Sequence, residues 1–137
     1  MSAPQPLPWL DLAQQDLDGA SDLLVSPRDH RPLVAYHVQQ AAEKAVKAAL
    51  VLRGIDPRKS HDIALLAESL GTGDPLYPIC ARPGAVSVYA TLYRYPDGDR
   101  PEPPDPAELV AWIAEISDLM GKLLGMATGT PRPKEAA

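Results

Sequence analysis

Apolar residues recur every three or four positions in several stretches of the chain, as they do along one face of a helix. The first stretch runs from Trp9 to Leu24 and should end near Ser26 and Pro27. Pro8 suits the first turn of this helix, where its missing N–H costs nothing. Aspartates fill the intervening positions (Asp11, Asp16, Asp18 and Asp22). The pattern therefore predicts an amphipathic helix at the start of the chain.

The longest helical pattern covers residues 35–52 and is stopped by Gly54. On a helical wheel, one face carries small apolar residues (Val38, Ala42, Ala45, Ala49 and Leu52), and another carries polar ones (Tyr36, Gln40, Glu43, Lys44 and Lys47). Glu43 and Lys47 have the spacing of a favourable ion pair on a helix. The simplest interpretation of the polar stripe is a solvated face, and the alternative is a functional surface.

Shorter helical stretches, divided by Pro and Gly, follow this helix. Ser60 is expected to cap a helix that runs from Ile63 to Leu70. Another helix is expected mainly at residues 85–93, because Pro78, Pro83 and Gly84 interrupt the apolar run before it.

A capping-box pattern predicts the start of the last helix. Asp105 is the expected cap, Pro106 occupies the first helical position, and Glu108 completes the pattern. An apolar stripe follows, and Gly125 should end the helix.

Four to five helices, with no alternating strand pattern and no internal repeat, predict an all-α, up-and-down helical bundle. The length of 137 residues fits one domain. We place this domain at residues 9–125, between a flexible N-terminus (1–8) and a disordered tail (126–137).

The composition limits the chemistry of the chain. There is no Phe, so the core must come from Leu, Val, Ile and Ala, with Trp9 and Trp112 as anchors. The single cysteine, Cys80, gives no internal disulfide and is expected to be a small buried hydrophobe. The histidines (His30, His37 and His61) lack the spacing of a metal site, and we expect neither a metal nor another cofactor.

The net charge of −5 argues against a protein that coats nucleic acid non-specifically. Five basic residues nevertheless fall between Lys44 and Lys59, which leaves room for a local phosphate site. The N-terminus lacks the pattern of a signal peptide, and no apolar run approaches the ~20 residues of a membrane span. We therefore expect a cytoplasmic protein without a membrane partner.

Three segments together resemble the HEPN family (higher eukaryotes and prokaryotes nucleotide-binding). They are the Gln-Gln-Ala-Ala-Glu-Lys-Ala run within residues 35–50, Ser60-His-Asp shortly after it, and Tyr93-Arg-Tyr-Pro. The opening helix is similar to the family's first helix, and the resemblance covers residues 9–124. It implies a bundle that dimerises through its helices and is often paired with a minimal nucleotidyltransferase in a toxin–antitoxin system.

Many members of the family are metal-independent ribonucleases, which implies where catalytic residues should lie. In those members an Arg and a His, separated by four to six residues, act on an RNA phosphate and its neighbouring 2′-hydroxyl. The corresponding Arg here is Arg94, but no His follows it. Arg31 and His37 have the spacing formally, at the start of the long helix. The catalytic candidates are therefore Arg94, Arg31 and His37.

The expected nucleotide- or RNA-binding residues are Arg94, Tyr95, Gln40, Lys44, Lys47 and His61. Arg94 either contacts a phosphate or stabilises a helix end. His61 either helps to receive a phosphate at a helix start or packs against the long helix. Tyr95 is also a candidate for modification, because in related pairs the partner adenylates a Tyr beside the catalytic motif.

Four polar residues of the long helix either face a groove between two subunits or form the polar rim of a dimer interface (Gln39, Gln40, Lys44 and Lys47). The leading hypothesis is a dimeric nucleotide- or RNA-binding partner of a minimal nucleotidyltransferase, in which the Arg-x(4–6)-His motif is absent or altered. The alternatives are a metal-independent endoribonuclease toxin and a non-catalytic helical adaptor.

Overall fold

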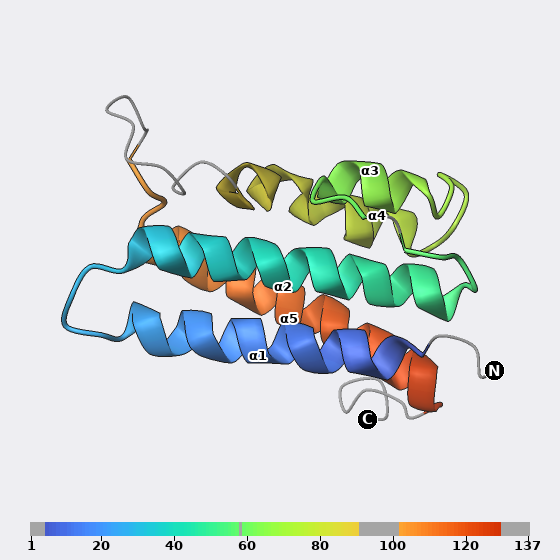
Figure 1. The fold of residues 1–137 in the computed structure, drawn as a ribbon, viewed down its shortest axis with the longest axis horizontal. Coiled ribbons are helices and arrows are strands. Elements are labelled where there is room, and N and C mark those ends of the chain that lie inside the picture. Colours follow the sequence, from blue (N-terminus) through green and yellow to red (C-terminus); the bar gives the residue numbers. More distant parts are fainter. Residues whose placement is uncertain (1–4, 58, 91–101, 130–137) are drawn as a thin grey trace.

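The computed structural model of the chain describes residues 5–57, 59–90 and 102–129. Within these residues every regular element is helical (Figure 1). The elements are α1 (Pro6–Leu24), α2 (Arg31–Leu52), α3 (Ile63–Glu68), α4 (Tyr77–Ala81), the 3-10 helix η1 (Arg82–Ala90) and α5 (Pro106–Thr128). The predicted all-α bundle is confirmed.

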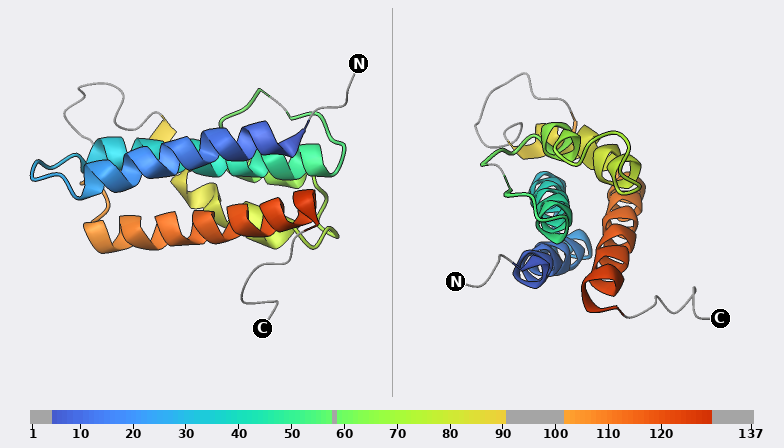
Figure 2. Two further views of the ribbon diagram at one scale, coloured as in Figure 1. Left: turned by 90° about the horizontal axis from the view of Figure 1, so that it is seen from below. Right: turned by 90° about the vertical axis from the view of Figure 1, so that its right-hand side faces the viewer.

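Three long helices form the body of the bundle, with α1 and α5 both against α2 (Figures 1 and 2). α1 and α2 run in opposite directions, whereas α2 and α5 run in the same direction. The chain returns between them through α3, α4 and η1, which together make the third leg of an up-and-down arrangement. α2 is the central helix, because α1, α5, α3 and η1 all contact it.

The core is built from small and branched side chains, as the absence of Phe requires. The alanines of α2 are fully buried and allow close helix packing (Ala41, Ala42, Ala45, Ala48 and Ala49). Leu50, Ile63 and Ile116 are among the largest side chains at the centre of the core. Trp9 and Trp112 are only partly buried and pack against the margin of this core.

Both long N-terminal helices begin earlier than predicted. α1 starts at Pro6, so residues 6–8 of the expected flexible N-terminus are helical, and residues 1–4 lie outside the described residues. α2 starts at Arg31, followed by Pro32. Proline is tolerated in a first turn because the N–H groups there have no partner within the helix. The ends near Leu24 and at Leu52 agree with the prediction.

The third leg differs most from the expectation. Asp62 and not Ser60 caps α3: its carboxylate accepts a hydrogen bond from the backbone N–H of Leu65 (3.2 Å), while Ser60 Oγ accepts from Asp62 N–H (3.1 Å). The helix predicted at residues 85–93 begins earlier, as α4 and η1. Pro78 and Pro83 each lie in a first turn and therefore do not interrupt these helices. Residues 91–93 lie outside the described residues.

The start of α5 is as predicted, but its end is not. Asp105 Oδ1 accepts a hydrogen bond from Glu108 N–H (2.8 Å), and Pro106 is the first residue of the helix. The helix continues past Gly125 to Thr128 and ends at Gly129, whose φ of 71° is left-handed. Glycine inside a helix costs only about 1 kcal/mol, which the packing of α5 offsets. Residues 126–128 of the expected tail are thus helical, and 130–137 lie outside the described residues.

None of the helices in the described part of the chain combines the length and the apolar character needed to cross a membrane.

Candidate functional site

The polar stripe of α2 is covered to a large extent by its neighbours. The side chains of Glu43 and Lys47 are only 5% and 10% exposed, whereas Tyr36, Gln40 and Lys44 are partly buried. The expectation of a solvated face is therefore wrong for Glu43 and Lys47. These two side chains are buried because α2 is the central helix and most of its surface is covered by its neighbours.

Asp16 of α1 joins two side chains of this face. One carboxylate oxygen lies 3.0 Å from His37 Nδ1, and the other accepts a hydrogen bond from Lys44 Nζ. The three side chains are 13% to 29% exposed. The ring of Tyr36 meets the ring of His37 edge-on, with centroids 5.7 Å apart. We call Asp16, His37 and Lys44 the first triad.

Glu43 is the centre of a second, deeper group of the same kind. Its Oε1 lies 2.6 Å from His61 Nδ1, and its Oε2 accepts from Lys47 Nζ (3.4 Å). We call Glu43, His61 and Lys47 the second triad. The ion pair predicted between Glu43 and Lys47 is thereby confirmed.

Two glutamines extend the second triad along α2. Gln39 Nε2 donates to Glu43 Oε1 (3.3 Å), and Gln40 Nε2 donates to Gln39 Oε1 (2.7 Å). Gln39 is fully buried, while Gln40 is partly exposed. A chain of hydrogen bonds therefore links the buried carboxylate of Glu43 to a side chain that reaches the surface.

Each triad presents an imidazole whose Nδ1 is occupied. An ionised carboxylate only accepts hydrogen bonds, so Nδ1 is the donor in both contacts and Nε2 is the nitrogen left for other partners. The side chain of His61 is 72% exposed, and that of His37 is 29% exposed. An imidazole oriented in this way is suited to hydrogen bonding and to proton transfer.

The charges of the two triads balance. Lys44 faces Asp16, and Lys47 faces Glu43, so each lysine already has a carboxylate partner. The attraction of this face for a phosphate is correspondingly reduced. The groups on this face that can still bind a ligand are aromatic rings, the amide of Gln40 and two imidazoles.

Arg31 and His37, one pair of catalytic candidates, are not brought together. The guanidinium of Arg31 donates two hydrogen bonds of 2.9 Å to the carboxylate of Asp29, and the backbone N–H of Arg31 donates a third (3.1 Å), while His37 contacts Asp16. Six positions along a helix place the two side chains roughly 120° apart around its axis. The hydrogen bond from Arg31 lowers the pKa of Asp29 to about 2, and the bond to Asp29 raises the pKa of Arg31.

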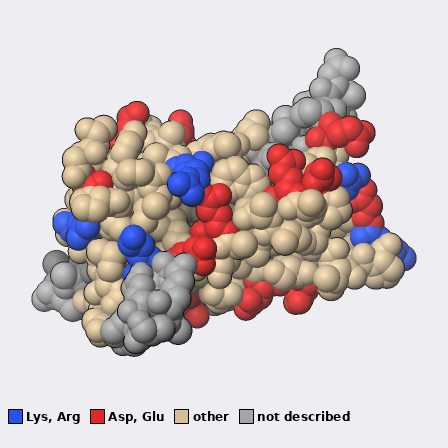
Figure 3. Space-filling model, turned by 180° about the vertical axis from the view of Figure 1, so that it is seen from behind, with Lys and Arg blue, Asp and Glu red and all other residues tan. Residues whose placement is uncertain are grey.

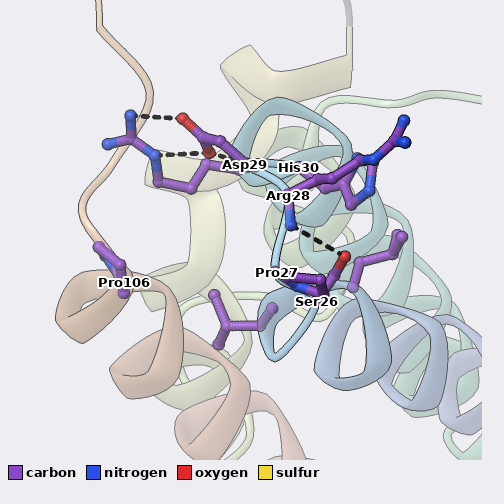
Figure 4. Close-up of a pocket in the computed structure, with 9 residues that line it drawn as sticks. Ser26, Pro27, Arg28, Asp29, His30 and Pro106 are labelled. Carbon is purple, nitrogen blue, oxygen red and sulfur yellow. Dashed lines mark hydrogen bonds and ion pairs between the residues drawn. The ribbon is translucent and has the colours of Figure 1, made fainter.

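A pocket of about 370 Å³ lies where α1 ends and α2 and α5 begin (Figure 4). Its lining residues are Leu23, Leu24, Ser26, Pro27, Arg28, Asp29, His30, Arg31 and Pro106. Asp29 and Pro106 lie across from Arg28 and His30 in Figure 4. Of the candidates named from the sequence, this pocket contains only Arg31.

The HEPN domain model matches residues 7–123 of the chain. The chain belongs to the HEPN domain family. The match includes both triads, and the family supports a role related to nucleotides or RNA in general. Comparisons with curated proteins and with solved structures gave no match.

Two of the residues expected to bind or to act in this HEPN domain, Arg94 and Tyr95, lie outside the described residues. Gln40, Lys47 and His61 belong to the hydrogen-bond network around Glu43, whereas Lys44 contacts Asp16 in the first triad. His61 contacts Glu43 of the long helix through Nδ1, but its side chain is 72% exposed, so its proposed part in phosphate binding stays a prediction.

Sequence reasoning missed Asp16, which holds His37 and Lys44 in the polar network of the HEPN domain. Asp16 belongs to the acidic series on α1 and is partly buried, whereas its neighbour Asp18 is exposed. The position of Asp16 beside the apolar residue Leu17 is compatible with partial burial. Its partners on α2 cannot be found from a local pattern, because they lie 21 and 28 residues away in the sequence.

Other chemistry is limited in the described residues. Within them, no group of three metal-ligating side chains occurs. Cys80 is buried, and burial raises its pKa to about 12, so the thiol is inert. On the face opposite to that of Figure 1, basic side chains are isolated and acidic ones are spread widely (Figure 3).

Proposed function

We propose that this HEPN-domain protein is a nucleotide- or RNA-binding protein of the cytoplasm that works as a dimer with a minimal nucleotidyltransferase in a toxin–antitoxin-like pair. Its Arg-x(4–6)-His nuclease motif is absent or altered. Membership of the family supports the ligand class, the dimer and the partner. The observation that carries the binding function is the polar face of α2, where the rings of Tyr36 and His37 meet edge-on and the partly exposed Gln40 lies one helical turn after Tyr36.

Tyr36, His37 and Gln40 provide the means to recognise a base. Tyr36 and His37 are partly exposed, and an aromatic side chain that stacks on a base contributes about 1–3 kcal/mol. One N–H of the Gln40 amide donates to Gln39, and its carbonyl and second N–H can bind other partners. A carboxamide can pair with the edge of a base, most favourably adenine.

The phosphate of the ligand needs a cation from elsewhere, because Lys44 and Lys47 are already paired. Arg94 is our candidate for this contact, in line with the family's use of an Arg at that position. Few phosphate contacts imply a shallow dependence of affinity on salt, since each contact adds about one unit to the slope. The affinity should thus come mainly from stacking and hydrogen bonding.

The test of this function is a titration of the full chain with fluorescent ATP and, separately, with a labelled single-stranded RNA that contains all four bases. We expect saturable binding to one of the two probes and a loss of about tenfold in Arg94→Ala, the value of one charged hydrogen bond. Lys122→Ala removes a cation of α5, outside the polar face, and should bind as the wild type does. Absence of binding to both probes contradicts the proposal.

The partner is tested separately, by size-exclusion chromatography with a minimal nucleotidyltransferase encoded beside this chain. We expect the chain alone to elute as a dimer and the mixture to elute as a larger complex. Independent elution of the two proteins contradicts the proposed pair without affecting the binding result.

A second function, that of a metal-independent endoribonuclease, is favoured by one observation. His61 is an exposed imidazole held by a buried carboxylate, which is the arrangement of a proton-transfer group.

A further inference from the structure

A groove of about 370 Å³ lies between α1 and α5, far from the polar face of α2 in chemistry and sharing no residue with it. The two helices contact each other and run in opposite directions, so the first turns of α1 lie beside the last turns of α5 (Figures 1 and 2). We call it the α1/α5 groove.

The apolar part of the α1/α5 groove is open to the outside. Leu10 and Met120 are each 6% exposed, whereas Leu7 and Leu124 are 44% and 48% exposed. Single exposed leucines are ordinary on a protein surface, but here two of them, from different helices, line the same groove. Apolar side chains gathered in this way are typical of a surface that binds a partner.

Short side chains on α5 provide the room for the groove. Ser117 and Gly121 line it and lie one helical turn apart. Because Gly121 has no side chain and Ser117 a small one, a helix laid along the groove can approach α5 closely.

The edge of the groove on α1 is negatively charged. Asp11 lines the groove, and Asp18 lies two helical turns further along the same face. Their hydrogen-bond partners are the neutral amides of Gln15 (3.1 Å) and Gln14 (2.9 Å). Since α1 contains neither Lys nor Arg, no cation of this helix offsets the two charges.

α5 adds little positive charge to the groove. It contains Glu108, Glu115 and Asp118, and Lys122 is its single basic residue. The carboxylate of Glu115 is paired with Arg82 (3.0 Å). The surroundings of the α1/α5 groove are therefore acidic on balance.

This charge decides between the classes of occupant. Carboxylates repel the phosphates of a nucleic acid and of an anionic membrane surface. A second copy of the chain, bound across a two-fold axis, would bring the acidic edge of one α1 against the same edge of the other. A segment of opposite charge with an apolar face fits both properties of the groove.

We propose that the α1/α5 groove binds an amphipathic helix of a partner protein, with Leu-like side chains on one face and Lys or Arg beside them. A helix of this kind presents apolar anchors at positions i, i+3 or i+4, and i+7. These anchors span about 10 Å, as do the two helical turns from Leu7 to Gln14 and from Ser117 to Leu124. The apolar anchors contact Leu7 and Leu124, and the basic flank faces Asp11 and Asp18. The inference goes beyond the proposed function and does not depend on it.

The test uses the full chain and a fluorescein-labelled peptide of about 18 residues, which is long enough to form a helix. Its leucines follow the spacing given above, and lysines flank them. The control peptide has the same composition in an order that gives no apolar face. We expect saturable binding of the first peptide by fluorescence anisotropy and at least about tenfold weaker binding of the control.

Variants of α5 locate the bound peptide. Gly121→Leu fills the groove while raising helix propensity, so the chain should fold and bind about tenfold more weakly. Leu124→Glu should cause a similar loss. Val110→Glu is the matched control, because it makes the same kind of change at an exposed apolar residue of α5 outside the groove, and it should bind as the wild type does.

A charge reversal tests the acidic edge. Asp11→Lys should weaken binding of the lysine peptide and strengthen binding of the same peptide with Glu in place of each Lys. Unchanged affinity for both peptides would overturn the charge argument.

Three further outcomes overturn the proposal. They are equal binding of the first and control peptides, wild-type affinity in Gly121→Leu, and a smaller assembly of Leu124→Glu than of the wild type in sedimentation velocity. The last result would show that a second copy occupies the groove. Titrations of Gly121→Leu with RNA and ATP should match those of the wild type, so this proposal and the proposed function can fail separately.

Discussion

The ammonium group of Lys47 lies 5.5 Å from the centre of the Trp9 ring, so α1 closes over a charged residue of α2. With its side chain 10% exposed, Lys47 has its ammonium between Trp9 and the carboxylate of Glu43. In our account Lys47 therefore supports the site through Glu43 and does not itself reach a phosphate. The buried charges of the second triad are then a matter of stability as well as of function.

Replacing Glu43 alone should be costly, because it leaves Lys47 buried without its partner. We expect Glu43→Leu to lower the free energy of unfolding by about 3 kcal/mol, as measured by urea denaturation. The double variant Glu43→Leu/Lys47→Met removes both charges and should recover most of this loss. A double variant no more stable than the single one would show that the pairing of charges is not the cause.

Asp16 should matter more to stability than Asp18 on the same helix. Asp16→Ala removes the contacts to both His37 and Lys44, and we expect a loss of about 1.5–3 kcal/mol in the free energy of unfolding. Asp18→Ala is the matched control, since Asp18 is exposed and contacts only Gln14 in the described residues. Its effect should stay within about 0.5 kcal/mol. Equal effects of the two changes contradict the role given to the first triad.

The titration of Asp29 provides a test of the Arg31 contact. Its pKa of about 2 lies below the ordinary value of 3.8, because Arg31 donates hydrogen bonds to the ionised form. A lowered folded-state pKa means that this contribution to stability is present above pH 3.8 and is lost as the pH falls toward 2. NMR of the side-chain carboxyl should show this midpoint, and Arg31→Met should move it toward 3.8. A wild-type midpoint near 3.8 contradicts the contact.

Cys80 should be unreactive while the protein is folded. Its thiol is buried and has a pKa of about 12, so it is almost entirely protonated near pH 8. We expect the disulfide reagent DTNB to release no colour from the native chain within minutes and to react fully once urea has unfolded it. Rapid reaction of the native chain would mean that the α4 region opens readily.

Local patterns were enough to predict the helices whose signals lie within a few residues. The cap formed by Asp105 with Glu108 N–H and the pairing of Glu43 with Lys47 are both contacts of this short range. Prolines were harder to interpret, because Pro78 and Pro83 break a helix interior but suit a first turn. Only the three-dimensional course of the chain decides between these two positions.

The candidate site depended on contacts that no local pattern contains. Asp16 and Lys44 are 28 residues apart, and Glu43 and His61 are 18 residues apart. The sequence therefore identified the residues of α2 and His61 as polar candidates but gave no means to find the carboxylates that hold the two imidazoles. Lys47 is likewise buried because α1 packs against it, and a helical wheel of α2 alone does not show which neighbouring helix covers a residue.

The central claim is that the polar face of α2 binds a nucleotide or RNA, and Tyr36 offers its most direct test. The measurement is a fluorescence anisotropy titration of the labelled single-stranded RNA, or of fluorescent ATP if that is the probe bound, at fixed salt. Loss of a stacked ring should weaken binding by at least about fivefold in Tyr36→Ala, whereas Gln15→Ala, on the exposed surface of α1, should match the wild type. Wild-type affinity in Tyr36→Ala would contradict the claim that this face binds the ligand.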